Sequence, residues 1–152
     1  RVLKSGMRKR LGLSFILVRT AWFMLPVTLL AGLAALYGLA GRNGGTLFGF
    51  LLLFGWLLTF LLAILQRIMP FLASMFAPPV ANGGTAIVSE FANARSLRIH
   101  AICHGLALAL LTAAILLGDT TLARLGSAAG LAGALAFAWF TADVVRRIVP
   151  ER

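Results

Sequence analysis

Four long apolar runs divide this chain, and short stretches rich in Gly, Asn, Pro and charged residues separate them. The runs lie at residues 20–40, 46–68, 98–118 and 122–148. A helix needs about 20 residues to cross the hydrocarbon core of a bilayer, and each run has that length. Only 12% of the residues are charged and 61% are hydrophobic, whereas a soluble domain is about a quarter charged. The pattern predicts an all-α integral membrane four-helix bundle, forming a single transmembrane domain over residues 1–152.

The basic residues are distributed unequally between the two sides of the predicted membrane domain. One set of connecting segments carries twelve of the fourteen: Arg1, Lys4, Arg8, Lys9, Arg10, Arg19, Arg67, Arg95, Arg98, Arg146, Arg147 and Arg152. The opposite side carries Arg42 and Arg124. Cationic loops stay in the cytoplasm during insertion, so we expect a multi-pass protein with both termini cytoplasmic. The Ala-, Leu- and Arg-rich composition favours a bacterial inner membrane.

The net charge of +10 does not indicate a nucleic-acid partner. The cations gather at the ends of the apolar runs, where anionic lipid headgroups lie. They do not form a basic face interleaved with aromatic rings, as a single-strand groove requires. We therefore expect the lipid bilayer, and other membrane subunits, to be the partners of this chain.

The connections predict how the helices pair. Residues 1–19 form a basic lead-in, which is either a helix on the headgroup layer or a flexible tail that only sets orientation. Pro26 predicts a kink in the first span. The short turns at 41–45 and 119–121 predict two antiparallel transmembrane hairpins, the first span with the second and the third with the fourth.

The longest connection, residues 69–97, is expected on the inner side. Its first part, 69–80, is apolar but broken by three prolines, so we expect Pro70 to end the second span and the segment to lie in the interface or dip into the protein. Residues 85–97 have apolar positions near helical spacing and predict a short surface helix.

Small residues recur every four positions in the third and fourth spans. They allow the close backbone approach that holds membrane helices together, so the two spans are expected to pack through them. The stripes are Ala101, Gly105, Ala109 and Ala113 in the third span and Gly126, Gly130, Ala134 and Ala138 in the fourth.

The second span differs, because bulky Phe and Trp side chains lie around much of it. It faces either lipid or a large partner, such as a subunit, a further part of the chain, a pigment or haem.

Ionisable residues inside a span are costly and are functional candidates by default. His100 and His104 lie one turn apart and share a face, and Cys103 lies to one side. Together they could present two imidazoles and a thiolate to copper or zinc. Asp143 on the next span could orient an imidazole, and Arg98 begins the third span.

Other roles for these residues stay open. Two side chains from one helical face cannot supply both axial ligands of a haem, although either histidine could supply one. His100 could be solvated at the interface and His104 could bond a neighbouring helix. Asp143 has the spacing of a helix salt bridge to Arg146 and Arg147, and proton or ion handling near Asp143 is a third possibility.

Two stretches carry a resemblance to a known family. Residues 48–70, FGFLLLFGWLLTFLLAILQRIMP, followed by RIHAICHG at 98–105, resemble late helices of haem-copper oxidase subunit I and NnrS-like multi-span membrane proteins. The resemblance implies haem or copper held by transmembrane histidines. Both histidines of this sequence lie in the third run, so it also allows a chain that keeps only the scaffold.

The familiar catalytic motifs do not occur in the sequence: it has no GxSxG, P-loop, HExxH or GxGxxG pattern. Four acidic residues leave little for a paired-carboxylate mechanism. We expect a non-catalytic membrane subunit or scaffold of an inner-membrane complex, which requires no cofactor. The alternative is a haem- or copper/zinc-binding redox protein that uses His100, Cys103 and His104.

Overall fold

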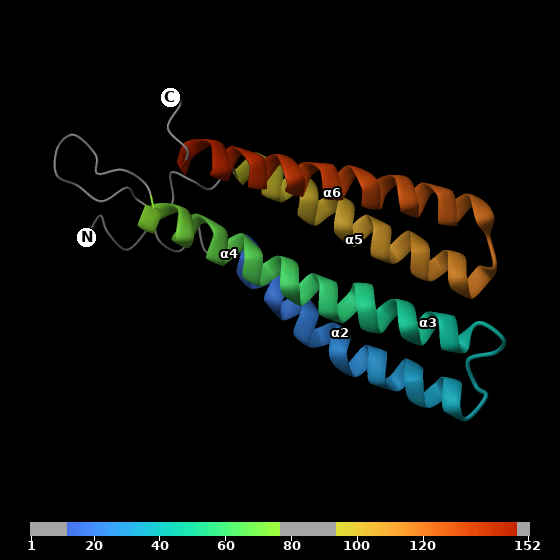
Figure 1. Ribbon diagram of the computed structural model, residues 1–152. Coiled ribbons are helices and arrows are strands. Elements are labelled where there is room, and N and C mark those ends of the chain that lie inside the picture. The colour runs from blue at the N-terminus through green and yellow to red at the C-terminus, as the bar shows by residue number, and fades with distance from the viewer. Residues whose placement is uncertain (1–11, 77–93, 149–152) are drawn as a thin grey trace, which may run out of the picture.

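The computed structural model describes residues 12–76 and 94–148, which form helices joined by turns. The elements are α2 (Gly12–Leu36), α3 (Gly44–Phe50), the π-helical η1 (Leu51–Leu58), α4 (Thr59–Phe76), α5 (Ala94–Leu117) and α6 (Thr120–Ile148). Because α3, η1 and α4 follow one another without a break, they make one long helical rod, called the α3–α4 rod below (Figure 1).

Four helical segments of the described chain are long and apolar enough to cross a membrane. They are Phe15–Leu36, Gly44–Ala73, Arg95–Leu117 and Thr120–Arg146. The prediction of an all-helical chain with four helices of membrane-spanning length is therefore confirmed.

The bounds of the helices differ from the predicted ones at the end of the bundle where α2 begins. Helix α2 begins at Gly12, so part of the predicted lead-in continues the first span; the rest of the lead-in lies outside the described residues. Helix α4 passes through Pro70 to Phe76, so the predicted break at Pro70 is wrong. A proline inside a membrane helix is tolerated where neighbouring helices shelter the freed backbone, and Pro70 and Ala73 are both buried. Of the predicted surface helix, only 94–97 is described, and it belongs to α5.

Glycines in the left-handed region end two of the helices. The backbone of Gly38 has φ 72°, and hydrogen bonds from Leu39 N to Ala34 O (2.8 Å) and from Gly38 N to Ala35 O (3.1 Å) close the last turn of α2. Gly118 has φ 68° and follows α5 in the same way. These are Schellman-type ends, which a residue without a Cβ adopts at low cost, and they reverse the chain sharply.

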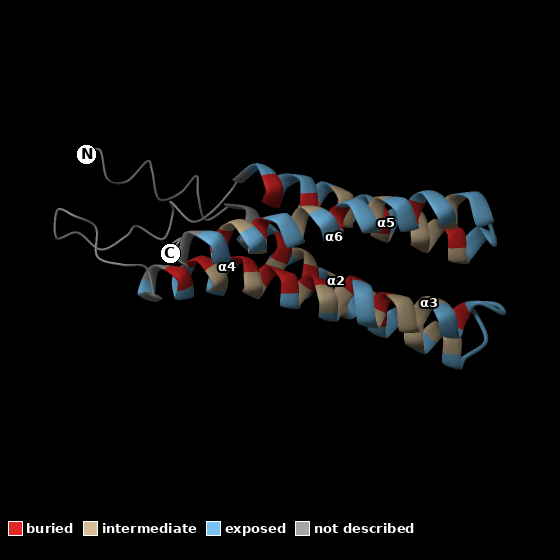
Figure 2. Cartoon of the chain, turned by 45° about the horizontal axis from the view of Figure 1, so that its top comes forward, coloured by how far each residue is buried: buried red, intermediate tan, exposed pale blue. Residues whose placement is uncertain are grey.

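The reversals produce two helix pairs (Figure 1). Helix α2 packs along the α3–α4 rod, and α5 packs along α6; we call these the first and second helix pairs. Buried residues lie on the faces that the helices turn toward one another (Figure 2). Large apolar side chains cover the outside, including Trp22 and Trp139, each 63% exposed, which is a surface suited to lipid rather than water.

At the end of the bundle where α2 begins and α6 ends, one apolar cluster joins the two pairs. Ala73 of the rod, Leu97 of α5, and Phe140 and Val144 of α6 are buried together, with Met69 and Phe137 packed against them. This cluster brings α4, α5 and α6 together at one end of the bundle.

The close contact between α5 and α6 runs through glycines of α6. A Cβ placed on Gly126 would lie 2.8 Å from Leu111 Cγ, and one on Gly130 would lie 3.6 Å from Ala107 Cβ. A Cβ on Gly133 would lie 3.2 Å from Cys103 Cβ. The backbones therefore approach one another as the small residues predicted. Gly126 and Gly130 of the predicted stripe lie at the contact, and Gly133, which was not predicted, lies there as well.

The two middle members of the predicted stripe on α5 do not lie at this contact. Gly105 and Ala109 are exposed, and a Cβ on Gly105 would meet open space. On α6, Ala134 and Ala138 are exposed as well. Residues spaced exactly four apart are displaced by about 40° around an α-helix at each step. Along a long helix such a stripe therefore turns away from the neighbouring helix. Residues spaced alternately three and four apart stay on the contacting face.

Candidate functional site

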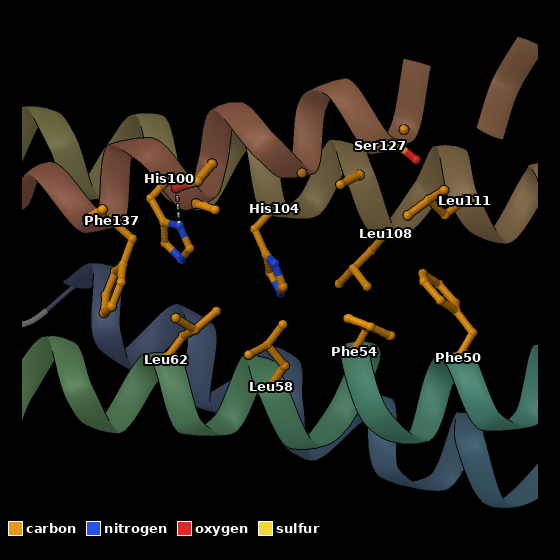
Figure 3. A pocket seen from close by; sticks show the side chains of 16 residues that line it. Phe50, Phe54, Leu58, Leu62, His100, His104, Leu108, Leu111, Ser127 and Phe137 are labelled. Atoms are coloured by element: carbon orange, nitrogen blue, oxygen red, sulfur yellow. Dashed lines mark hydrogen bonds between the residues drawn. The ribbon is translucent and has the colours of Figure 1, made fainter. Parts of the chain in front are cut away.

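A cavity of about 410 Å³ lies between the α3–α4 rod and the second helix pair, within the range of small-molecule sites. Its walls are aromatic and aliphatic side chains with His100, His104 and Ser127 as the polar members (Figure 3). The described residues that line it include no charged side chain. The cavity is thus an apolar space with two imidazoles at its wall.

His100 is only 3% exposed and is held by the backbone of α6. Its Nδ1 lies 3.0 Å from the carbonyl oxygen of Gly133. Because a carbonyl can only accept, Nδ1 carries the proton and donates it. In the neutral imidazole the other nitrogen, Nε2, is then an acceptor, and it is buried without a hydrogen-bond partner among the described residues. The ring hangs from α5 toward the rod (Figure 3).

His104 has the opposite arrangement. Its Nε2 lies 2.8 Å from the Thr59 hydroxyl, and that hydroxyl lies 3.0 Å from Phe54 O. The hydroxyl has one hydrogen, which it donates to the Phe54 carbonyl, so it accepts the hydrogen bond from His104 Nε2–H. Since Thr59 is fully buried, this contact is a sheltered polar bridge between the two helix pairs.

The π-helical stretch η1 places Thr59 for this bridge. The Thr59 hydroxyl bonds the carbonyl five residues earlier, at Phe54, instead of the four-residue step usual in an α-helix. Wide π turns inside α-helices are frequent at functional sites. Here the turn lies directly across from the imidazoles and supplies Phe54 and Leu58 to the cavity wall.

Aromatic rings surround the two imidazoles. The rings of His100 and His104 are stacked, with centroids 5.7 Å apart, and His100 lies 5.1 Å from the Phe137 ring. Phe50 and Phe54 stack at 5.4 Å on the rod, and Figure 3 shows them at the far end of the space from Phe137. A planar ring entering the cavity would find aromatic surfaces at both ends.

The predicted three-ligand metal set does not come together. The described residues contain no group of three His, Cys, Asp or Glu side chains placed to hold an ion. Cys103 does not line the cavity; it lies at the close contact with Gly133. The physical reason is helical geometry: Cys103 and His104 are successive residues, about 100° apart around α5, so the thiol packs toward α6 and the imidazole toward the rod.

The other predicted ionic residues lie outside the cavity. Arg98 is exposed, and Asp143 is half-buried ten residues beyond Gly133 on α6, about 15 Å along the helix. Asp143 therefore does not orient either imidazole. The Gly133 carbonyl orients His100 and Thr59 orients His104, and sequence reasoning identified neither as a partner.

A weak signal for both partners exists in the sequence. Thr59 is the one hydroxyl residue in the apolar stretch 47–65, and Gly133 is a glycine that falls outside the four-residue stripe. Gln66 was also missed: it is 5% exposed, and neither amide atom has a partner in the described part of the chain. It does not line the cavity.

No protein-family model, curated protein or solved structure matches this chain. What the site can do follows from its own chemistry. It offers a fixed acceptor nitrogen, aromatic walls and no countercharge. An ion in such a place would lack compensation, whereas a neutral apolar molecule would fit the lining.

Proposed function

We propose that this chain is a non-catalytic subunit of a bacterial inner-membrane complex that holds a small neutral molecule between its two helix pairs. The observation that carries the proposal is the buried, unpartnered Nε2 of His100 at the wall of an apolar cavity. A buried acceptor without a partner costs free energy, about 1–3 kcal/mol. A guest that supplies a partner would remove this cost.

The proposed setting is the bilayer, crossed four times as two antiparallel hairpins with both termini in the cytoplasm. The four helices of spanning length support the crossings, and the sorted basic residues support the orientation. The large apolar side chains outside the bundle would contact lipid and neighbouring subunits.

Binding fits the cavity better than catalysis does. General acid–base chemistry needs titratable groups within reach of one another and of a substrate. The titratable side chains among the described lining residues are two imidazoles, each with one nitrogen engaged by the protein, and no carboxylate is among them. The Ser127 hydroxyl donates to the Ala123 carbonyl of its own helix at 2.8 Å, so no base activates it.

The second candidate is a haem-, copper- or zinc-binding redox protein, in line with the family resemblance. One observation favours it: an imidazole whose Nδ1–H bonds a backbone carbonyl leaves Nε2 free, as metal-ligating histidines do. The described lining residues oppose it, because no anionic ligand is among them. His104 Nε2, in addition, is engaged by Thr59.

The test uses the purified chain in mild detergent and p-cymene, a neutral hydrocarbon ring. We expect p-cymene to raise the unfolding temperature in a concentration-dependent way, because a ligand that binds only the folded state stabilises it. Ala134→Phe, which places a ring in the cavity wall away from the α5–α6 contact, should abolish the shift. Gly105→Ala, at an exposed site in open space, should retain it.

Two results would decide against this proposal. An unfolding temperature unchanged at saturation both by p-cymene and by thymol, its hydroxylated analogue, would remove the binding site. A visible absorption band or one bound metal per chain, lost on His100→Ala, would favour the redox alternative instead.

A further inference from the structure

The two imidazoles differ in the hydrogen-bonding state of their Nε2 atoms, and this difference indicates which chemical group a guest must carry. His100 has its proton on Nδ1 and turns a bare Nε2 toward buried space. His104 has its Nε2 proton engaged by Thr59. The unmet requirement of the cavity is therefore a hydrogen-bond donor at His100 Nε2.

The lining restricts what can carry that donor. No charged side chain is among the described lining residues, so an ammonium group or a metal ion would enter without a counter-ion, at high cost in a membrane interior. A neutral hydroxyl avoids that cost. Water is a poor alternative, because it needs two to four polar partners and the wall near His100 is formed by apolar side chains such as Leu62 and Phe137.

The shape of the lining favours a ring. Phe137 lies beside His100, and the stacked Phe50 and Phe54 lie at the other end of the cavity (Figure 3). Aromatic molecules pack on such rings in offset or edge-to-face geometry, which adds to the gain from burial. A volume of about 410 Å³ is suited to one substituted ring with a short tail.

We propose that the guest is a membrane-soluble phenol, hydroquinones included, whose hydroxyl donates to His100 Nε2. This inference rests on the proposed function and names the ligand class of the same cavity. The hydroxyl would supply the partner that the protein leaves out, and the ring would lie among the phenylalanines. His104 and Thr59 would keep their own bond and hold the two helix pairs around the guest.

The test compares four ligands built on one skeleton: p-cymene, thymol, thymol methyl ether and thymohydroquinone. Affinities are measured by titration of the full chain in nanodiscs. We expect thymol and thymohydroquinone to bind about three- to tenfold more tightly than the ether, the worth of one hydrogen bond to a buried acceptor. A further gain for thymohydroquinone over thymol would assign a hydroquinone, and equal affinity a monophenol.

His100→Phe is the decisive variant, because it keeps a ring in place and removes the acceptor. The preference for hydroxyl over ether should disappear in this variant and persist in Gly105→Ala. A measurement on the unmodified protein guards against misfolding of the variant. With ¹⁵N-labelled histidine, thymol should shift the Nε2 resonance of His100 and leave that of His104 in place, since His104 Nε2 already carries its proton.

Different results would contradict the phenol class, the proposed function and the assignment to His100. If p-cymene and the ether bind as tightly as thymol, the cavity takes apolar guests and the phenol class is wrong. If none of the four binds, the proposed function fails together with this inference. If thymol is preferred but His100→Phe keeps the preference, the donor bonds another atom and the assignment to His100 is overturned.

Discussion

Gly133 is the residue at which helix packing and site chemistry coincide. A Cβ there would lie 3.2 Å from Cys103 Cβ and 3.5 Å from His104 N. Its carbonyl oxygen accepts the hydrogen bond from His100. A side chain at this position would push α5 away from α6 and lengthen that bond.

Gly133→Ala is therefore expected to destabilise the protein by about 1–3 kcal/mol, the usual cost of overpacking a close contact. Gly105→Ala is the matched control, because its Cβ would meet open space, and it should be neutral or slightly stabilising since Ala is the better helix former. Equilibrium unfolding in mixed detergent micelles measures both. Equal stability of the two variants would show that α5 and α6 do not meet at Gly133.

At the residue level, the sequence predicted the shared face of the two histidines and allowed a bond from His104 to a neighbouring helix, which Thr59 provides, but it did not identify the partner residues. The spacing of His100 and His104 correctly predicted a shared face, and the rings stack. The partner of His100 could not be predicted, because it is a main-chain carbonyl, which every residue possesses. The position of the Cys103 side chain depends on which face of α5 packs against α6. The sequence of α5 alone does not determine that face.

At the scale of the element, the ends of the helices are built from local chemistry. Asp119 stands immediately before α6, and its Oδ1 accepts hydrogen bonds from Thr121 N at 2.6 Å and Leu122 N at 3.2 Å. This is an N-cap, which satisfies amides that have no partner inside the helix. The bonds from Thr121 and then Leu122 lower the pKa of the Asp119 carboxyl below its ordinary value of 3.8.

The cap makes a pH-dependent contribution with a definite sign. When the pKa of a carboxyl is lower in the folded than in the unfolded state, the ionised carboxylate stabilises the fold at any pH above the unfolded-state pKa. That stabilisation is lost as the pH falls through the folded-state pKa. We expect the unfolding temperature of the native chain to fall more steeply below about pH 4 than that of Asp119→Asn, which keeps a neutral cap. Asp119→Ala should be less stable at neutral pH. Parallel acid profiles of the native chain and Asp119→Asn would contradict this role.

The helices themselves were predictable because run length and apolarity decide them, and four helices of spanning length are present. The ends were harder to predict. Pro70 has the sequence signature of a helix exit, yet the helix continues to Phe76 because Ala73 is buried against Leu97 and Phe140. Such tertiary contacts override the tendency of proline to end a helix, and the neighbouring sequence does not reveal them.

At the scale of the whole molecule, polar contacts within the described residues join the helix pairs at both ends and in the middle. The Asn43 side-chain amide donates to Ile115 O at 2.9 Å near the turns that follow α2 and α5. Thr59 and His104 meet in the middle. Near the apolar cluster at the other end, the Thr141 hydroxyl, which donates to Phe137 O at 3.0 Å, lies 3.8 Å from Met69 Sδ. The cavity lies among contacts that hold the pairs in register along their length.

The proposed orientation predicts which positions are reached from outside an intact cell. In a Cys103→Ser background, Thr120→Cys at the outer turn should react with a membrane-impermeant maleimide. Arg146→Cys, exposed near the end of α6, should react only after the membrane is permeabilised. The reverse pattern, or labelling of both positions in intact cells, would overturn the assignment of cytoplasmic termini.

The backbone origin of the bond that fixes His100 has an evolutionary consequence. Since the acceptor is a main-chain oxygen of Gly133, substitutions at neighbouring α6 positions such as Ala134 and Ala138 can reshape the wall without turning the imidazole. For the bond to His100, position 133 has to stay without a side chain. Under the proposed function, the preference for a guest can change among descendants of this sequence while the orientation of the His100 ring is kept.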